Sequence, residues 1–199
     1  RFLKIYLAAT SALVILLLGL AGGRWFQDSR KGPPSRVIQE FDSISMTDER
    51  GRELWRVKFE DPIQFEEDAR RMPVDQRAVF ADLDGDGHLE TYYVYVPASA
   101  TEKGTTLFCY SDQGQEMWRF TPGRKVATAS HVFEPPYSTT SLATLPAARA
   151  GDARILVVSH HVIEFPTQVA LLSPDGRLQG EYWHSGLLTT AETKDLDGD

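Results

Sequence analysis

The stretch that decides the fold reads DLDGDGHLETYYVYV and runs from Asp82 to Val96. Its second part, TYYVYV, consists of aromatic and β-branched residues, which is typical of a β-strand. Its first part places acidic side chains at relative positions 1, 3, 5 and 9 and a glycine, Gly87, at position 6, where the chain can turn sharply. The stretch therefore predicts an acidic loop that leads directly into a strand.

The acidic loop predicts a calcium site, because Ca²⁺ takes about six to eight oxygen ligands from flexible loops. Without a cation, carboxylates this close together would repel one another and raise each other's pKa. An EF-hand is excluded, since position 12 is Tyr93 instead of a glutamate and a strand follows instead of a helix. The alternative is a solvated turn that binds nothing. The predicted ligands are the side chains of Asp82, Asp84, Asp86 and Glu90 and the backbone carbonyl of His88.

A second loop of the same kind begins near the end of the sequence. The last five residues read DLDGD and repeat positions 1, 3 and 5, so we predict metal ligands at Asp195, Asp197 and Asp199. The chain begins at Arg1 without a methionine and stops inside this motif. We therefore expect the sequence to be a piece of a longer protein.

Turns of one type recur at a nearly constant spacing. Gly51 precedes Trp55 by four positions, and Gly114 precedes Trp118 by the same four, 63 positions further on. A third turn of this type contains Gly176, another 62 positions along the chain. Each turn predicts a β-hairpin, and a fixed period of this length favours a propeller. Further strands are predicted at Thr91–Val96, Thr106–Tyr110, Ile155–Ser159 and Thr167–Leu172.

The predicted fold class is all-β, as a partial β-propeller of about two to three antiparallel blades. The alternative is a β-sandwich, which has similar strands and turns. The loop DLDGDGHLE entering a strand resembles the FG-GAP and VCBS-type repeats of integrin-α-like β-propellers, over roughly Ser43 to Asp199. The resemblance implies calcium binding through the five loop positions named above. The turn followed by tryptophan also resembles the blades of quinoprotein-like propellers.

The beginning of the chain predicts a membrane segment. Ile5 to Ala21 are seventeen residues without a charge, which is just long enough for a helix to cross a bilayer. We therefore assign residues 1–26 to a transmembrane or signal-anchor segment, 27–42 to a polar linker that contains two prolines, and 43–199 to the truncated repeat region. The alternatives are a secretory signal cleaved near Ala21 and a buried helix.

Composition excludes several classes of protein. The chain has 21 basic and 28 acidic residues and a net charge of -7, and the part after Lys31 alone carries -11, so we expect no nucleic-acid partner. A single cysteine, Cys109, excludes an internal disulfide framework and multi-cysteine metal sites; its apolar surroundings predict a small buried side chain. The adjacent His160 and His161 are expected to be packing or surface residues.

These observations predict a membrane-anchored calcium-binding propeller fragment that recognises a protein or a glycan, in adhesion or sensing. Positive charges flank the apolar segment on both sides and do not decide its orientation. Because calcium sites of extracellular modules are weak, we expect the repeat region outside the cytoplasm, where calcium is plentiful. The alternatives are a quinoprotein-like or hydrolytic enzyme on a propeller and a purely structural subunit. The sequence nominates no nucleophile with a matching base.

Overall fold

The computed structural model describes residues 32–65, 72–145, 152–188 and 191. The predicted membrane segment at 1–26 and the second acidic loop at Asp195, Asp197 and Asp199 lie outside the described residues. Within the described part of the chain, no helix has the length and apolar character needed to cross a membrane. The sheets described belong to one compact unit, residues 33–199.

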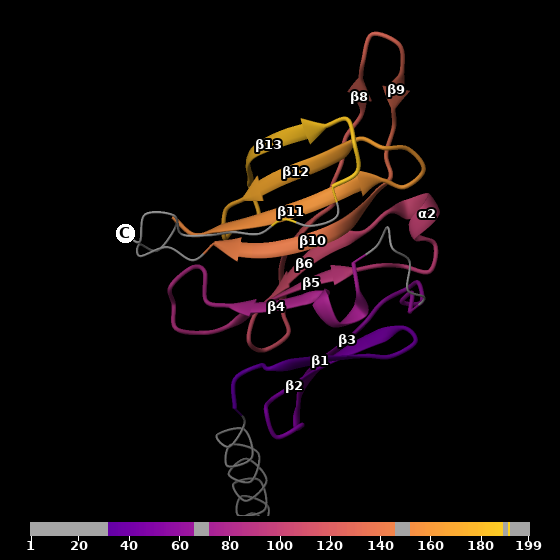
Figure 1. Cartoon of the computed structure of the whole chain (residues 1–199). Helices are drawn as coiled ribbons and strands as arrows, with labels where there is room; N and C mark the ends of the chain where they lie inside the picture. The colour runs from indigo at the N-terminus through magenta and orange to yellow at the C-terminus, as the bar shows by residue number, and fades with distance from the viewer. Residues whose placement is uncertain (1–31, 66–71, 146–151, 189–190, 192–199) are drawn as a thin grey trace, which may run out of the picture. The chain divides into compact units, whose positions relative to one another are not determined.

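The described chain is all-β, as predicted, and forms four antiparallel sheets, none of which closes on itself. Three sheets are meanders in which the strands follow one another in sequence order (Figure 1). Their strands are β1 (Arg36–Gln39), β2 (Ser43–Thr47) and β3 (Glu53–Lys58); β4 (Ala78–Ala81), β5 (Glu90–Tyr95), β6 (Thr106–Tyr110) and β7 (Glu116–Phe120); and β10 (Tyr137–Leu145), β11 (Arg154–His161), β12 (Thr167–Leu172) and β13 (Leu178–His184).

The remaining elements are short. A two-stranded hairpin pairs β8 (Val126–Ala127) with β9 (Val132–Phe133), and Figure 1 shows it projecting beyond the third meander. A single turn of 3-10 helix, η1 (Val74–Gln76), precedes β4, and the four-residue helix α2 (Ala100–Lys103) joins β5 to β6. None of these pieces is long enough to give a recognisable hydrophobic period in the sequence.

The first strand lies inside the stretch assigned to the linker, so the folded region begins at Arg36 and not at Ser43. The four residues of β1 alternate between exposed and half-buried, and the strand pairs with β2 from Arg36 opposite Thr47 to Gln39 opposite Ile44. So short a strand is set by its hydrogen-bonded neighbour and not by a local pattern. The polar, proline-containing residues just before it concealed it in the sequence.

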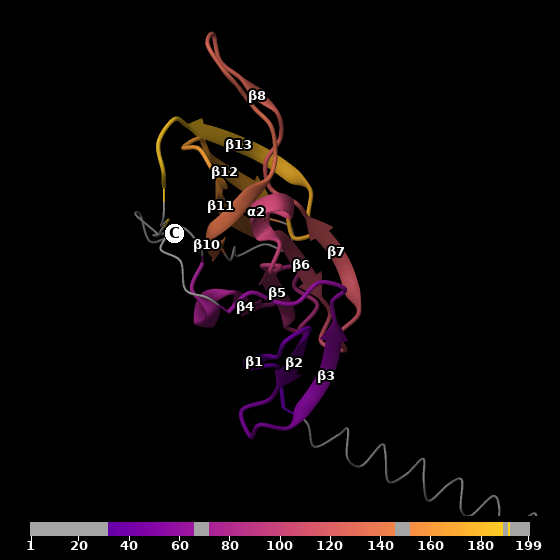
Figure 2. The ribbon, with the colours of Figure 1, turned by 90° about the vertical axis from the view of Figure 1, so that its right-hand side faces the viewer.

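The three meanders end in equivalent hairpins, as predicted. In each, the glycine N–H donates to the carbonyl of the residue three positions earlier, at 2.9 Å for Gly51 and Gly176 and 3.0 Å for Gly114. Each hairpin also contains a register shift at its mouth. Figure 2 shows β3 and β7 on the right of the first two meanders and β1 and β4 on the left, whereas the strands of the third meander run from β10 below to β13 at the top.

The middle meander is buried on both faces, which explains its nearly continuous apolar sequence. On β5, Tyr92 and Val94 belong to a core shared with the third meander, whereas Tyr93 belongs to a core shared with the first. The core shared with the third contains Leu107, Cys109, Ile155, Val157, Ala170 and Leu172, and the core shared with the first contains Ile44, Met46, Trp55, Phe59, Ile63, Phe108 and Tyr110. The three meanders therefore pack face to face in sequence order.

Contacts between one turn and the preceding meander repeat along the unit. A Cβ atom built on Gly114 would lie 2.6 Å from the indole of Trp55, and one built on Gly176 would lie 2.5 Å from the indole of Trp118. Trp118 also donates its indole N–H to the carbonyl of Pro174 at 2.8 Å. Each of these turns thus presents bare backbone to the tryptophan of the meander before it.

Cys109 is expected to resist thiol reagents in the folded protein. Its side chain is completely buried in the core between the second and third meanders, and this burial raises the pKa of the thiol well above its usual range. Labelling with an excess of a maleimide, followed by mass spectrometry, should show modification only after denaturant is added. Rapid labelling of the native chain would contradict the packing described here.

Candidate metal centre

The acidic loop connects β4 to β5 and is closed at its base by the last pair of their ladder. Ala81 lies opposite Glu90, so the loop leaves one strand and returns to the other at the same point. The backbone then curls around the carboxylate of Asp82, which accepts hydrogen bonds from the N–H groups of Gly85 at 2.7 Å and Gly87 at 2.9 Å. Asp82, the first of the predicted metal ligands, therefore holds the loop in its curled conformation.

The next two acids hold the rest of the loop in the same way. Asp84 accepts from the N–H of Asp86 at 3.1 Å, and Asp86 accepts from the N–H of His88 at 2.8 Å. As a result Asp82, Asp84 and Asp86 each bring a carboxylate oxygen within 4.8 Å of the other two. Three anionic oxygens at this separation form a favourable site for a hard cation.

Glu90 lies beneath this cluster, at the start of β5. Only 4% of its surface is exposed, and its carboxylate accepts a hydrogen bond from the N–H of Leu83 at 3.3 Å. Burial raises the pKa of Glu90 to about 7, and the charges of the three aspartates act in the same direction. A buried carboxyl group next to three aspartates is the fourth acidic group of the loop, although it lies outside the compact cluster that the aspartates form.

The side chain of His88 makes a contact that the sequence did not suggest. Its Nδ1 lies 2.9 Å from the carboxylate of Asp112, in the turn between β6 and β7. The contact ties the acidic loop to the neighbouring hairpin of the same meander. It is independent of the predicted role of His88, which was assigned to its backbone carbonyl.

The donor set suits a hard divalent cation. It consists of oxygen atoms, lies in a loop exposed to solvent and is supported from below by the ladder of two paired strands. Carboxylate and carbonyl oxygens are ligands that hard cations such as Ca²⁺ and Mg²⁺ take. The three aspartates form a cluster that could hold a metal ion.

Comparison of the chain with protein-family models, curated proteins and solved structures gave no match. The interpretation of the loop depends on its own geometry. The structure brings together Asp82, Asp84 and Asp86 and places Glu90 at the base of the loop. The spacing of acidic residues in the sequence predicts this loop. No local sequence pattern predicts a separate pocket at one end of the third meander, because the residues that line it come from three distant segments.

Proposed function

We propose that this chain is a calcium-binding β-propeller repeat region that serves as a rigid scaffold for recognition of a protein or a glycan. The observation that carries the proposal is the curled loop at Asp82–Glu90, in which three carboxylates converge above a buried fourth. Bound calcium would neutralise these charges and fix the entrance to β5, the strand buried on both faces. Its role would then be structural, as the resemblance to FG-GAP and VCBS-type repeats implies.

The arrangement of the sheets supports blades of a propeller over a sandwich. A sandwich commonly has Greek-key connections, which place strands from different parts of the chain in one sheet. Here each meander contains only consecutive strands, and three meanders pack in series. In two successive pairs of meanders, a turn glycine of one meander lies against the tryptophan of the meander before it. The sheets are therefore placed in the same way relative to one another, as expected for neighbouring blades.

The cellular setting belongs to the same proposal. The apolar segment at 1–26 would anchor the chain in a membrane, with the repeat region outside the cytoplasm, or would be a signal removed near Ala21. Weak calcium sites of extracellular modules fit this placement, because they fill only where calcium is plentiful. The acidic balance of the repeat region argues against a nucleic-acid partner.

Calorimetric titration of the full chain with calcium tests the proposal. We expect binding with Kd on the order of 10⁻⁴ to 10⁻³ M. Asp84→Ala should abolish binding at this loop, because it removes the middle carboxylate of the cluster. Asp75→Ala, which removes an exposed acid of η1, should leave the titration unchanged. The proposal would be wrong if no heat of binding were measured at millimolar calcium, or if Asp84→Ala bound calcium with the same affinity and stoichiometry as wild type.

A further inference from the structure

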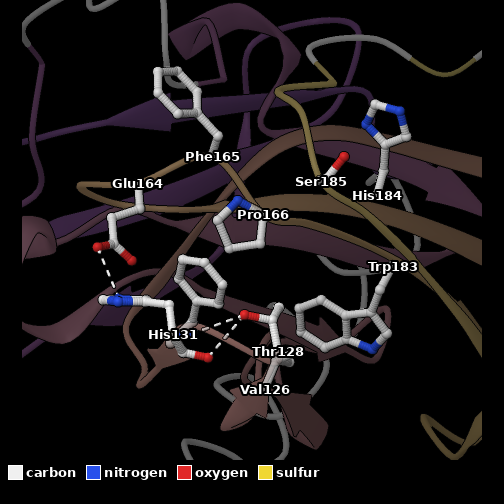
Figure 3. Close-up of a pocket in the computed structure, with 10 residues that line it drawn as sticks. Val126, Thr128, His131, Glu164, Phe165, Pro166, Trp183, His184 and Ser185 are labelled. Atoms are coloured by element: carbon white, nitrogen blue, oxygen red, sulfur yellow. Dashed lines mark hydrogen bonds and ion pairs between the residues drawn. The ribbon is translucent and has the colours of Figure 1, made fainter.

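A pocket of about 510 Å³ lies at one end of the third meander and takes no part in the metal centre. Three segments line it: the β8–β9 hairpin, the loop between β11 and β12, and the end of β13 (Figure 3). Its volume is in the range of pockets that enclose most of a small ligand. In Figure 3 the pair of Glu164 and His131 bounds one side, and Trp183 and His184 lie on the other.

Hydrogen bonds hold the walls of this pocket in place. His161 is buried beside it, and its Nδ1 accepts from the N–H of Glu164 at 3.0 Å, so its proton lies on Nε2 and is donated to the carbonyl of Glu134 at 2.8 Å. This one ring joins the base of the β8–β9 hairpin to the β11–β12 loop. Nε2 of His131 lies 3.1 Å from the Glu164 carboxylate and joins the same two walls nearer the opening. The pocket is therefore preformed.

Aromatic residues from all three segments line the pocket. Phe133 comes from β9, Phe165 from the β11–β12 loop and Trp183 from β13. Phe165 is 66% exposed, so most of its ring surface is open to solvent. The Trp183 ring is held by an edge contact with Tyr137, with centroids 5.6 Å apart. The guanidinium of Arg124 lies over the Trp183 ring, 5.3 Å from its centroid, so a ligand would stack on the part of that ring that Arg124 leaves uncovered.

The polar groups of the pocket are short and mostly uncharged. Thr128 and Ser185 contribute hydroxyl groups, and His184 contributes an imidazole whose Nδ1 lies 3.0 Å from the backbone nitrogen and 3.2 Å from the carbonyl oxygen of Gly186. Glu164 adds a carboxylate that already contacts His131. Among the described residues that line the pocket there is no lysine or arginine. The nearby Arg124, whose guanidinium lies over the Trp183 ring, is already paired with the carboxylate of Glu181.

We propose that this pocket binds one or two rings of a neutral saccharide. A sugar ring presents C–H groups on a face, which stack on aromatic rings, and hydroxyls around its edge, which need both donors and acceptors. The three aromatic side chains supply surfaces for stacking, and the hydroxyl, imidazole and carboxylate groups supply hydrogen-bond donors and acceptors. The methylated head group of an organic cation would fill only a small part of this volume. The inference rests on the proposed role in recognition and does not require calcium.

The test is a titration of the full chain with maltotriose, cellotriose and tri-N-acetylchitotriose, and with choline as the cationic probe, followed by tryptophan fluorescence and calorimetry. We expect saturable binding of at least one trisaccharide. Phe165→Ala should weaken it about tenfold, through the loss of one stacking surface. Ile163→Ala is the matched control: it alters a side chain of the same loop that is 77% exposed and does not line the pocket.

The inference would be overturned by the absence of trisaccharide binding at about 10 mM or by binding of choline alone. Equal affinity in Phe165→Ala and Ile163→Ala would place the saccharide elsewhere on the chain and would overturn it as well. The titration is repeated with the Asp84→Ala chain in a chelator. Saccharide binding there would support the pocket even if the calcium proposal failed, whereas calcium binding without saccharide binding would overturn the pocket alone.

Discussion

Gly114→Ala is expected to lower the free energy of unfolding by about 3 kcal/mol, whereas Gly51→Ala should lower it by about 1 kcal/mol. The two glycines occupy equivalent hairpins with φ of 80° and 74°, so both alanines carry the same left-handed backbone strain. Only at Gly114 does the new Cβ collide, at 2.6 Å from the ring of Trp55; at Gly51 nothing lies within 4 Å. Urea denaturation of both variants measures the difference.

The difference between these variants isolates the contact between neighbouring meanders. Gly176→Ala should behave as Gly114→Ala does, since its Cβ would lie 2.5 Å from Trp118. A double-mutant cycle with Trp55→Ala should recover part of the loss at Gly114, because alanine removes the Cγ and Cδ2 atoms that lie 2.6 Å from the new Cβ and keeps only the Cβ at 2.9 Å. Equal destabilisation at Gly51 and Gly114 would contradict the idea that each turn is seated on the preceding tryptophan.

Local patterns identified the parts of the fold that local chemistry determines. The stretch TYYVYV is apolar at nearly every position because both faces of β5 are buried. Val94 packs into the core shared with the third meander, and Tyr93 packs into the core shared with the first. The strands predicted at Thr106–Tyr110 and Thr167–Leu172 have those bounds in the structure. The hairpins were predictable because an acid or serine and a glycine suffice to make each turn.

Elements that depend on distant partners were not predictable. The strand β1 exists through its pairing with β2, and the hairpin β8–β9 has only two residues on each side. The third turn shows the same limit: Gly180 stands where the other hairpins have tryptophan, and Trp183 contacts Tyr137 instead of a following turn. Likewise His161 appeared to be a simple packing residue, because the two segments that it joins are separate in the sequence.

The candidate metal centre also has a part that the sequence predicts and a part that it does not. The convergence of Asp82, Asp84 and Asp86 follows from alternate positions on a tightly curled loop and was predictable from spacing alone. The burial of Glu90 was not, because it depends on Leu83 above it and on Tyr92, whose hydroxyl donates to Glu90 at 3.5 Å from within the core. It is this burial, which no spacing reveals, that makes the carboxyl group sensitive to pH.

Glu90→Gln is expected to stabilise the calcium-free protein at neutral pH and to have little effect near pH 4.5. The folded-state pKa of Glu90, about 7, lies above the ordinary value of 4.5, so the folded chain holds this proton more tightly than the unfolded chain. The stabilisation by the proton is complete below the unfolded pKa and is lost as the pH rises through about 7. Glutamine imitates the protonated group at every pH. The variant should therefore gain about 2 kcal/mol relative to wild type between pH 4.5 and 7.5, allowing for screening by solvent.

Urea denaturation in a chelator across this pH range gives the comparison, with Glu49→Gln, an exposed carboxyl in the β2–β3 turn, as the control. Calcium should narrow the difference in stability between the two proteins at pH 7.5. At about 10 mM calcium, a site of the expected affinity stabilises wild type by roughly 2 kcal/mol, because the cation binds only the folded loop. Glutamine offers a neutral oxygen in place of a carboxylate, so the variant should gain less. A calcium effect of the same size in both proteins would mean that Glu90 responds to the charges of the loop without contributing to the site.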